Sequence, residues 1–298
     1  MTEIIFEVIP YVKTVSETYA NKFADRIADV VKEAPVSMIN IPEIVEENHI
    51  GLPYYRNADN MQFGLKLKEK CQKEVMLNTV VVHHESKDIF EKWLDESISC
   101  GIRNYVFVGA KINSMKYPGP SVIEANSIAK SKKINFGNIF IPERANEVER
   151  LINKTISGCR FFTSQVLYEP ENAINVINKY WLRCSQINLK PSKFYLSFAP
   201  VSNIDDLTFL KWLGAEIKEE TERRLLSAQN IANESVKIAS EASSKIFGFF
   251  EKTKFRIQLG LNVEYITLHN LDITKILLQN LANLKLAADF PAQVKIIT

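Results

Sequence analysis

Two kinds of hydrophobic pattern alternate along the chain. Apolar, β-prone runs are typical of buried strands, and runs with apolar residues at helical spacing are typical of amphipathic helices. The strand pattern covers residues 3–10, 36–42, 75–83, 104–110, 136–142, 160–167, 193–201 and 258–268. The helix pattern covers residues 14–34, 58–71, 86–100, 121–132, 145–157, 171–186, 204–214, 217–250 and 272–289.

Each predicted strand is followed by a helix. Strict alternation predicts a parallel sheet with right-handed crossovers, and eight such units in 298 residues match the size of a (β/α)8 TIM barrel. We therefore predict a single α/β barrel domain over residues 1–298. Because segment 217–250 is longer than a barrel needs, we expect extra helices before the last strand. A doubly wound open sheet is the alternative, although no Gly-x-Gly-x-x-Gly follows an early strand.

Several boundaries have local signals. Ser86 stands before a helical run, Pro170 opens another, and Gly101 and Gly158 lie where helix C-caps are expected. The long segment between the second strand and the second helix, residues 43–59, is acidic at its start. It is either a lid or binding loop, or a solvated surface loop.

Composition narrows the class of protein. Hydrophobic residues make up 46% and charged residues 24%, and 37 Lys and Arg against 35 Asp and Glu give a net charge of +2. That balance gives no reason to expect a nucleic-acid partner, and no apolar run approaches the length of a membrane span. The four cysteines are scattered, which favours a reducing compartment without structural zinc. We expect a cytoplasmic protein.

Glu7 raises the sharpest question in the sequence. It stands inside the apolar run Ile4–Pro10, and a lone ionised carboxylate is costly to bury unless it is paired or solvated. Either Glu7 is a partly exposed strand residue with a cationic neighbour, or it faces the mouth of the barrel. Active sites of such barrels lie at the C-terminal ends of the strands, where Glu7 falls.

Other polar residues gather at the predicted strand ends. They include Asn40, Asn78, Thr79, His83, His84, Glu143, Thr163, Ser164, Gln165, Tyr168, Glu169, Ser197, Thr267, His269 and Asn270, while Gly109 and Ala110 end the fourth strand. Gln165 is the most telling, because glutamine has poor strand propensity and several hydrogen-bonding positions to satisfy; it is either a satisfied core amide or a reader of a heterocycle edge. His83 and His84 are adjacent and face opposite sides of a strand, so we expect no metal site.

In their order and spacing, these strand-end motifs resemble the methylenetetrahydrofolate reductase family, which is a (β/α)8 barrel. The resemblance runs from residue 3 to about residue 275. The matching motifs are Phe6-Glu7-Val8-Ile9-Pro10, Ile141-Pro142-Glu143, Lys154 with Gly158, Ser164-Gln165, Pro200-Val201-Ser202-Asn203 and Tyr265-Ile266-Thr267-Leu268-His269-Asn270.

Three departures fall at positions that hold FAD in the family. The fourth strand ends in Gly109-Ala110 without an aspartate, Leu77-Asn78-Thr79 stands where the family has a histidine-x-threonine pattern in the third strand, and Ile141 replaces a tyrosine. FAD is therefore doubtful as a cofactor. The chain is more similar to the flavin-independent branch known from mycobacteria, which takes hydride directly from NAD(P)H.

The resemblance implies an oxidoreductase of one-carbon metabolism. Its substrate is a 5,10-methylene-tetrahydropterin such as a folate, and NAD(P)H reduces it to the 5-methyl form. Glu7 is the implied general acid. Gln165, Asn40, Glu143, Tyr168 and Ser197 are implied substrate contacts, and Gly109, Ala110 and Asn78 are implied neighbours of the nicotinamide.

Three alternatives remain open. One is a tetrahydrofolate-dependent methyltransferase or demethylase on the same barrel, another is an FAD-dependent reductase, and the third is a subunit without chemistry. The sequence does not distinguish folate from a methanopterin-type carrier or NADH from NADPH, and a homo-oligomer stays open.

Overall fold

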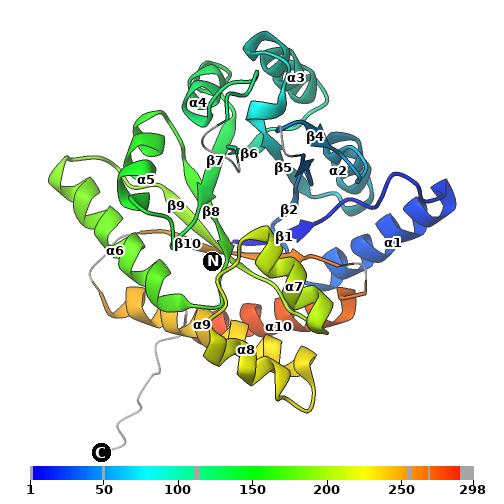
Figure 1. Cartoon of the computed structure of the whole chain (residues 1–298), viewed down its shortest axis with the longest axis vertical. Coiled ribbons are helices and arrows are strands. Elements are labelled where there is room, and N and C mark those ends of the chain that lie inside the picture. Colours follow the sequence, from blue (N-terminus) through cyan, green and yellow to red (C-terminus); the bar gives the residue numbers. More distant parts are fainter. Residues whose placement is uncertain (1–2, 49–50, 111–114, 254–256, 268, 289–298) are drawn as a thin grey trace, which may run out of the picture.

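Eight parallel strands close into a barrel with the spatial order β1-β10-β9-β8-β7-β6-β5-β2 (Figure 1). The structure is a computed structural model that describes residues 3–48, 51–110, 115–253, 257–267 and 269–288. The strands are β1 (Ile4–Val8), β2 (Met38–Ile41), β5 (Glu74–Val80), β6 (Asn104–Val108), β7 (Asn135–Phe140), β8 (Phe161–Val166), β9 (Lys193–Phe198) and β10 (Leu259–Tyr265). The closed sheet confirms the predicted (β/α)8 barrel and rules out the open sheet. Positions 268 and 289, the expected ends of two elements, lie outside the described residues.

Helices surround the barrel on its outer face (Figure 1). They are α1 (Glu17–Glu33), α2 (Asn60–Cys71), α3 (Lys87–Ser99), α4 (Val122–Ser131), α5 (Glu147–Ile156), α6 (Pro170–Gln186), α7 (Ile204–Leu213), α8 (Glu219–Leu226), α9 (Ile231–Lys252) and α10 (Leu271–Ala288). The expected boundary signals hold: Ser86 caps α3, and Gly101 and Gly158 follow α3 and α5 with φ of +85° and +107°. None of the described helices is long and apolar enough to cross a membrane.

The extra helices expected before β10 are present, but the prediction of one continuous helix over 217–250 is wrong. Two helices, α8 and α9, replace it, with a break at residues 227–230. Asn230 causes the restart, because its side chain accepts a hydrogen bond from the backbone N–H of Asn233 at 2.9 Å and caps α9.

Two loops contain structure that the pattern did not predict. The 43–59 segment carries a small antiparallel hairpin of β3 (Glu46–Glu47) and β4 (Pro53–Tyr54). The strand expected over 75–83 stops at Val80, and the 3-10 turn η1 (Val81–His83) follows it. The apolar run of residues 80–82 predicts a continuing strand. The strand ends at Val80 because its pairing with the neighbouring strands ends there, and that pairing is a tertiary contact.

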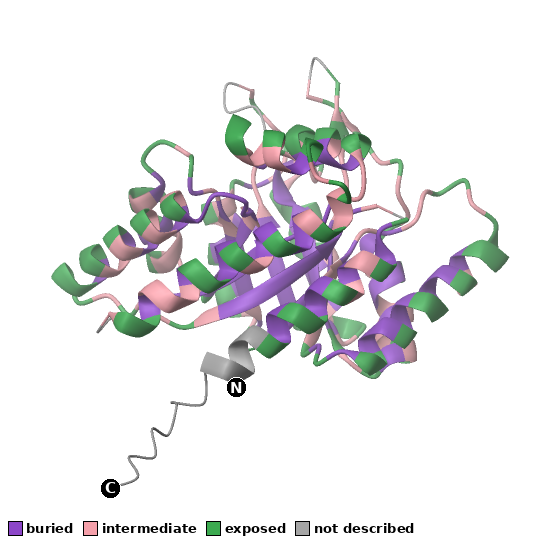
Figure 2. Ribbon diagram, turned by 90° about the horizontal axis from the view of Figure 1, so that it is seen from below, coloured by how far each residue is buried: buried purple, intermediate pink, exposed green. Residues whose placement is uncertain are grey.

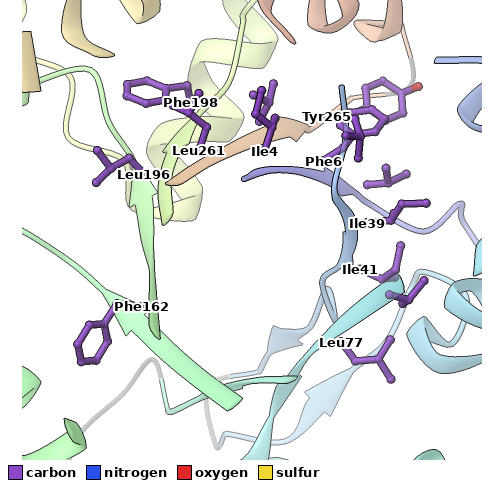
Figure 3. Close-up of a cluster of buried hydrophobic side chains, with 14 of the residues drawn as sticks. Ile4, Phe6, Ile39, Ile41, Leu77, Phe162, Leu196, Phe198, Leu261 and Tyr265 are labelled. Carbon is purple, nitrogen blue, oxygen red and sulfur yellow. The ribbon is translucent and has the colours of Figure 1, made fainter. Parts of the chain in front are cut away.

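The main core lies between the outer face of the barrel and the helices. Alternate strand residues such as Phe6, Ile39, Leu261 and Tyr265 point outward into it, and the buried faces of the helices cover them (Figures 2 and 3). The rings of Phe6 and Tyr265 lie 6.5 Å apart between their centroids. Both faces of each strand are therefore buried, which explains the nearly continuous apolar runs in the sequence.

The residues that alternate with this outer set point into the barrel. Ile5, Met76, Val106, Phe161 and Tyr195 form a separate buried cluster there. Phe161 and Tyr195 meet edge to face, with ring centroids 5.5 Å apart. These large rings fill the N-terminal part of the interior, so the barrel is packed rather than open there.

Two glycines make room for those rings. Gly137 pairs in register with Phe161, and Gly260 pairs with Tyr195. A Cβ atom at Gly137 would lie 2.4 Å from the Phe161 ring and 2.6 Å from its carbonyl oxygen, and one at Gly260 would lie 2.5 Å from the Tyr195 ring. Gly248 in α9 is different, because a Cβ atom there would meet nothing within 4 Å.

We predict opposite effects of alanine at these positions. Gly137→Ala lowers the free energy of unfolding by about 2 kcal/mol, because the backbone of β8 must move to admit the methyl group. Gly248→Ala raises it by up to about 1 kcal/mol through helix propensity. Urea unfolding of both variants and the wild type measures the difference. Equal effects of the two substitutions would contradict this account of the barrel interior.

Candidate functional site

A ring of polar side chains lies one layer above the apolar interior. All but Glu264 follow an inward-facing apolar or glycine residue by two positions, and Glu264 follows Asn262; side chains two apart on a strand share a face. The set is Glu7, Asn40, Asn78, Thr163, Ser197, Asn262 and Glu264. This layer lies towards the C-terminal ends of the strands, which is the mouth where barrel enzymes place their chemistry.

Glu7 is held at this mouth by two amides. Its Oε2 accepts hydrogen bonds from Nδ2 of Asn40 at 2.6 Å and Nδ2 of Asn262 at 2.9 Å. No cation is bonded to it in the described residues. Burial raises the pKa of Glu7 to about 7, although both amide bonds favour the charged form and oppose this rise. Glu7 is therefore an inward-facing carboxyl that exchanges a proton near neutral pH.

Glu264 lies directly across from Glu7 in the pairing of β1 with β10. Its Oε1 is 3.3 Å from the same Asn262 Nδ2, and it is hydrogen-bonded to Ser197. Burial, together with the charge of Glu7, raises the pKa of Glu264 well above its ordinary value. Two carboxyls that share one amide inside a barrel repel each other when both are charged, so each makes ionisation of the other less favourable.

Asn262 connects the two acids. Its Nδ2 lies within hydrogen-bond distance of Glu7, Glu264 and the Ser197 hydroxyl, the last at 2.9 Å. An amide nitrogen carries only two hydrogens, so the three acceptors share two donors. A proton on either carboxyl relieves this shortage, because the protonated group then donates.

Four buried polar atoms of this layer have no hydrogen-bond partner within the described part of the chain. They are Asn40 Oδ1, Asn78 Oδ1, Asn262 Oδ1 and Thr163 Oγ1. Buried polar groups are nearly always paired in folded proteins, so a cluster of four unpaired atoms at a barrel mouth indicates a place for a polar ligand. The three amide oxygens accept, which favours a ligand with several N–H or O–H donors.

The loop over this mouth carries two further carboxyls in unusual settings. Glu43 Oε2 accepts from the backbone N–H of Val80 at 2.7 Å and from the Thr79 hydroxyl at 3.3 Å, and burial raises its pKa to about 7. Glu47 bonds His83 Nε2 and the Tyr117 hydroxyl, both at 2.9 Å. Glu43 and Glu47 therefore fasten the acidic start of the loop to β5 and η1, while Glu46, Leu52 and Tyr54 remain exposed.

The adjacent histidines have different surroundings. His83 bonds Glu47, while the ring of His84 packs against Phe90 and Trp93, and burial lowers the pKa of His84 to about 4. In the described part of the chain no group of three His, Cys, Asp or Glu side chains could hold a metal ion.

The other sequence-predicted contacts are spread around the mouth. Asn40 and Ser197 join Glu7 in the acid network. Gln165 does not: its Nε2 donates to the Leu213 carbonyl at 2.7 Å, and its Oε1 accepts from Val166 N–H at 3.0 Å. This satisfied amide fastens β8 to the end of α7, and one N–H and one lone pair remain for a ligand.

The remaining predicted residues lie farther from Glu7. Tyr168 is buried in a second apolar cluster and donates its hydroxyl to the Ala199 carbonyl at 2.8 Å. Glu143 is exposed beyond the end of β7. Gly109 and Ala110 follow β6, which is separated from β1 by two strands on one side and four on the other. Asn78 lies nearer, on β5, and belongs to the unpaired layer.

A pocket of about 550 Å³ is lined by the segments that follow β1 and β10. Ile9 and Ile266, which directly follow β1 and β10, are part of its lining. The rest of the lining comes from the β1–α1 loop, the β2–α2 loop and α7 and comprises Pro10, Tyr11, Val12, Ile44, Glu46, Arg56, Asn57, Phe209, Trp212, Tyr265, Thr267 and His269. Its volume is typical of small-molecule sites.

The sequence interpretation missed Glu264 and Asn262, which complete the acid network. A signal was present, because Gly260, Asn262 and Glu264 are the polar or small members of a period-two run with Leu261, Val263 and Tyr265. Glu264 stands between Val263 and Tyr265, and a carboxylate inside an apolar run is the signal that singled out Glu7 on the first strand.

Comparisons with known proteins agree with the fold. No protein-family model and no curated protein matches the chain. Among solved structures, an uncharacterized protein from Clostridium thermocellum, described as binding two copies of 5-methyl-5,6,7,8-tetrahydrofolic acid, superposes with a TM-score of 0.80 at 19% identity, covering 95% of this chain and 96% of that one. A GH113 β-1,4-mannanase superposes with a TM-score of 0.53 at 9% identity, covering 93% and 98%. The likeness is in the barrel, which both share.

The acid network predicts a pH-dependent stability. Because the pKa of Glu7 is raised in the folded state, its favourable contribution is complete below the unfolded value of about 4.5 and is lost as the pH rises through about 7. Glu7→Gln keeps an acceptor for both amides. Because glutamine does not titrate, the variant does not lose stability at this position as the pH rises. Relative to the wild type, we expect the variant to gain about 2 kcal/mol in unfolding free energy between about pH 5 and about pH 8.

Urea unfolding at the two pH values measures this gain. Glu43 and Glu264 still titrate in the variant. Its unfolding free energy should therefore depend on pH less than that of the wild type, but it should not become independent of pH. A stability difference between variant and wild type that is the same at both pH values would show that Glu7 titrates normally.

Proposed function

We propose that this chain is a tetrahydrofolate-dependent oxidoreductase. It reduces a 5,10-methylene-tetrahydropterin to the 5-methyl form with hydride from NAD(P)H and without flavin. The observation that carries the proposal is Glu7, a buried carboxyl with a raised pKa in a layer whose amide oxygens have no partner in the described part of the chain. The folate-binding description of the Clostridium thermocellum barrel supports the same ligand class.

The reaction needs an acid at one atom. Opening the five-membered ring of the methylene form breaks a carbon–nitrogen bond, and the leaving nitrogen, N10, must be protonated as the bond breaks. A general acid works best when its pKa lies near the operating pH, as that of Glu7 does. Glu264 lies across from it and shares Asn262, so a retained proton on Glu264 keeps a second negative charge away from the acid.

The pterin ring supplies the hydrogen-bond donors that this mouth lacks. Its amino group and ring N–H groups match the unpaired oxygens of Asn40 and Asn262, which flank Glu7. Each pairing removes the cost of a buried unsatisfied acceptor, which is about 1–3 kcal/mol. The same two amides that hold Glu7 thus orient the substrate against it.

Asn78 is the residue that best fits a nicotinamide. Its Oδ1 is buried and unpaired in the described part of the chain, and a carboxamide NH2 would satisfy it. The reduced nicotinamide supplies a hydride when bound. Gly109 and Ala110 would offer backbone contacts at the end of β6 without a side chain in the way.

A methyltransferase is the second candidate. The compound named for the Clostridium thermocellum barrel is the 5-methyl form, which is the product of the reductase and also the donor of a methyl transfer. In that reaction Glu7 would protonate a leaving pterin nitrogen, and no nicotinamide would be needed.

Glu7→Gln tests the acid. The wild type should oxidise NADH or NADPH only when methylenetetrahydrofolate is present, and the variant should lose about 10²–10⁴-fold in kcat/KM because general acid catalysis contributes that much. Glu96→Gln, an exposed position on α3, is the matched control and should keep full activity. Circular dichroism of both variants verifies folding.

Other results would contradict the proposed mechanism or favour a different function. Full activity of Glu7→Gln would remove Glu7 from the mechanism. A wild type that consumes no NAD(P)H but demethylates 5-methyltetrahydrofolate in the presence of a thiol acceptor would favour the methyltransferase. A yellow protein with bound flavin would return FAD to the mechanism.

A further inference from the structure

We propose that the acid network is active with two protons, one on Glu7 and one on Glu264. In this proposal Glu264 is a positioning residue, because its protonation sets the orientation of Asn262, which contacts both acids. The inference rests on the proposed function, which uses Glu7 as the acid and Asn262 as a pterin contact, and deepens it. It assigns a role to Glu264 and predicts how activity is lost as the pH rises.

Three acceptors compete for the amide nitrogen of Asn262. Its Nδ2 lies 2.9 Å from Glu7 Oε2, 2.9 Å from Ser197 Oγ and 3.3 Å from Glu264 Oε1. Hydrogen bonds weaken with distance, so Glu264 is the poorest of the three acceptors in this arrangement. The amide therefore serves Glu7 and Ser197 first, which is the arrangement expected when Glu264 holds a proton.

The number of available hydrogens explains this expectation. An amide nitrogen carries two hydrogens, which are too few for three acceptors. A proton on Glu264 supplies the third hydrogen, and the Ser197 hydroxyl, to which Glu264 is bonded, can accept it. An ionised Glu264 supplies none and becomes a stronger, charged acceptor, so it draws Nδ2 of Asn262 away from Glu7.

The orientation of this amide matters at the barrel mouth. A carboxamide is planar, so the direction of Nδ2 also fixes the direction of Oδ1. Asn262 Oδ1 is buried and has no hydrogen-bond partner in the described part of the chain, and the proposed function assigns it to a donor of the pterin. Ionisation of Glu264 therefore weakens the hold on Glu7 and turns the pterin contact away in the same movement.

The two acids are each other's electrostatic partners. Burial raises the pKa of Glu264 first, and the charge of Glu7 raises it further. The strands on either side of the pair contribute uncharged groups, Asn40 of β2 to Glu7 and Ser197 of β9 to Asn262. The protonation of each carboxyl is therefore governed by burial and by the other carboxyl.

Other titratable groups on the surrounding elements have partners of their own. They are Glu43 of the β2–α2 loop, Tyr195 of β9, Asp206 of α7 and His269 after β10. Glu43 accepts from the Val80 N–H, Tyr195 donates to Glu3, and Asp206 lies 3.0 Å from His269 Nε2. Among them, Glu43 also has a pKa raised by burial to about 7, so it provides a matched control outside the pair.

The pH dependence of kcat/KM tests the requirement for two protons. On the steepest part of its alkaline limb, the wild type should lose about hundredfold per pH unit, because two required protons are lost. Glu264→Gln keeps N–H hydrogens for Ser197 and cannot ionise. Its kcat/KM should therefore fall only about tenfold per pH unit.

Two further variants separate positioning from a purely structural role. Glu264→Leu offers neither a hydrogen nor an acceptor, so it should lose about tenfold in kcat/KM at every pH. Glu43→Gln removes a buried carboxyl outside the pair and should retain the steep alkaline limb of the wild type. A structural role for Glu264 would change the rate in Glu264→Gln without changing the steepness of its pH profile.

Infrared titration of the free protein tests the coupling without any substrate. The C=O band of a protonated carboxyl disappears on ionisation, and difference spectra between variants isolate single groups. Glu264 in the Glu7→Gln variant should ionise about one pH unit lower than in the wild type, because the neighbouring charge is gone. In Glu43→Gln, Glu264 should ionise at the wild-type pH.

The outcomes separate this inference from the proposed function. If the wild type loses only tenfold per pH unit and Glu264→Gln has the same profile, or if Glu264 ionises at the same pH with and without Glu7, the inference is wrong while the function stands. If the wild type oxidises no NAD(P)H with methylenetetrahydrofolate at any pH, the proposed function fails and the two-proton requirement fails with it.

Discussion

A closed parallel barrel leaves a strand residue only two directions, and this constraint governs the rest of the structure. Outward side chains such as Phe6 must pack against helices, and inward ones must fill a narrow interior. Large rings of Phe161 and Tyr195 fill the N-terminal part, which is feasible only because Gly137 and Gly260 lie beside them. Polar side chains are thereby confined to the layer above, at the mouth.

That confinement explains how the chain tolerates buried carboxyls. Glu7 and Glu264 lie opposite each other, and amides hold them where the described part of the chain offers no cation. The arrangement favours the protonated forms, so it costs stability as the pH rises while keeping an acid ready near neutral pH. Such a trade of stability for reactivity is typical of functional sites, and it distinguishes this pair from the exposed ion pairs on the helices.

The loops after β1 and β2 are fastened to each other and to β5 at the barrel mouth. Glu43 and Glu47 fasten the β2–α2 loop to β5 and η1, and the Val12–Asn57 bridge joins that loop to the β1–α1 loop. These contacts fix one wall of the pocket before any ligand arrives, while α7 provides the other. Preorganisation of this kind lowers the ordering cost of binding.

The sequence by itself determined the eight strand–helix units and favoured a barrel with Glu7 near the C-terminal end of its first strand, because period-two and helical patterns are local and the size of the fold follows from their number. It did not determine where β5 ends, the break before α9, or that Gln165 would bond α7. Nor did it pair Glu7 with Glu264, 257 positions apart in the chain. Only barrel closure brings β1 beside β10, so the acid pair, its shared Asn262 and its raised pKa belong to the tertiary structure.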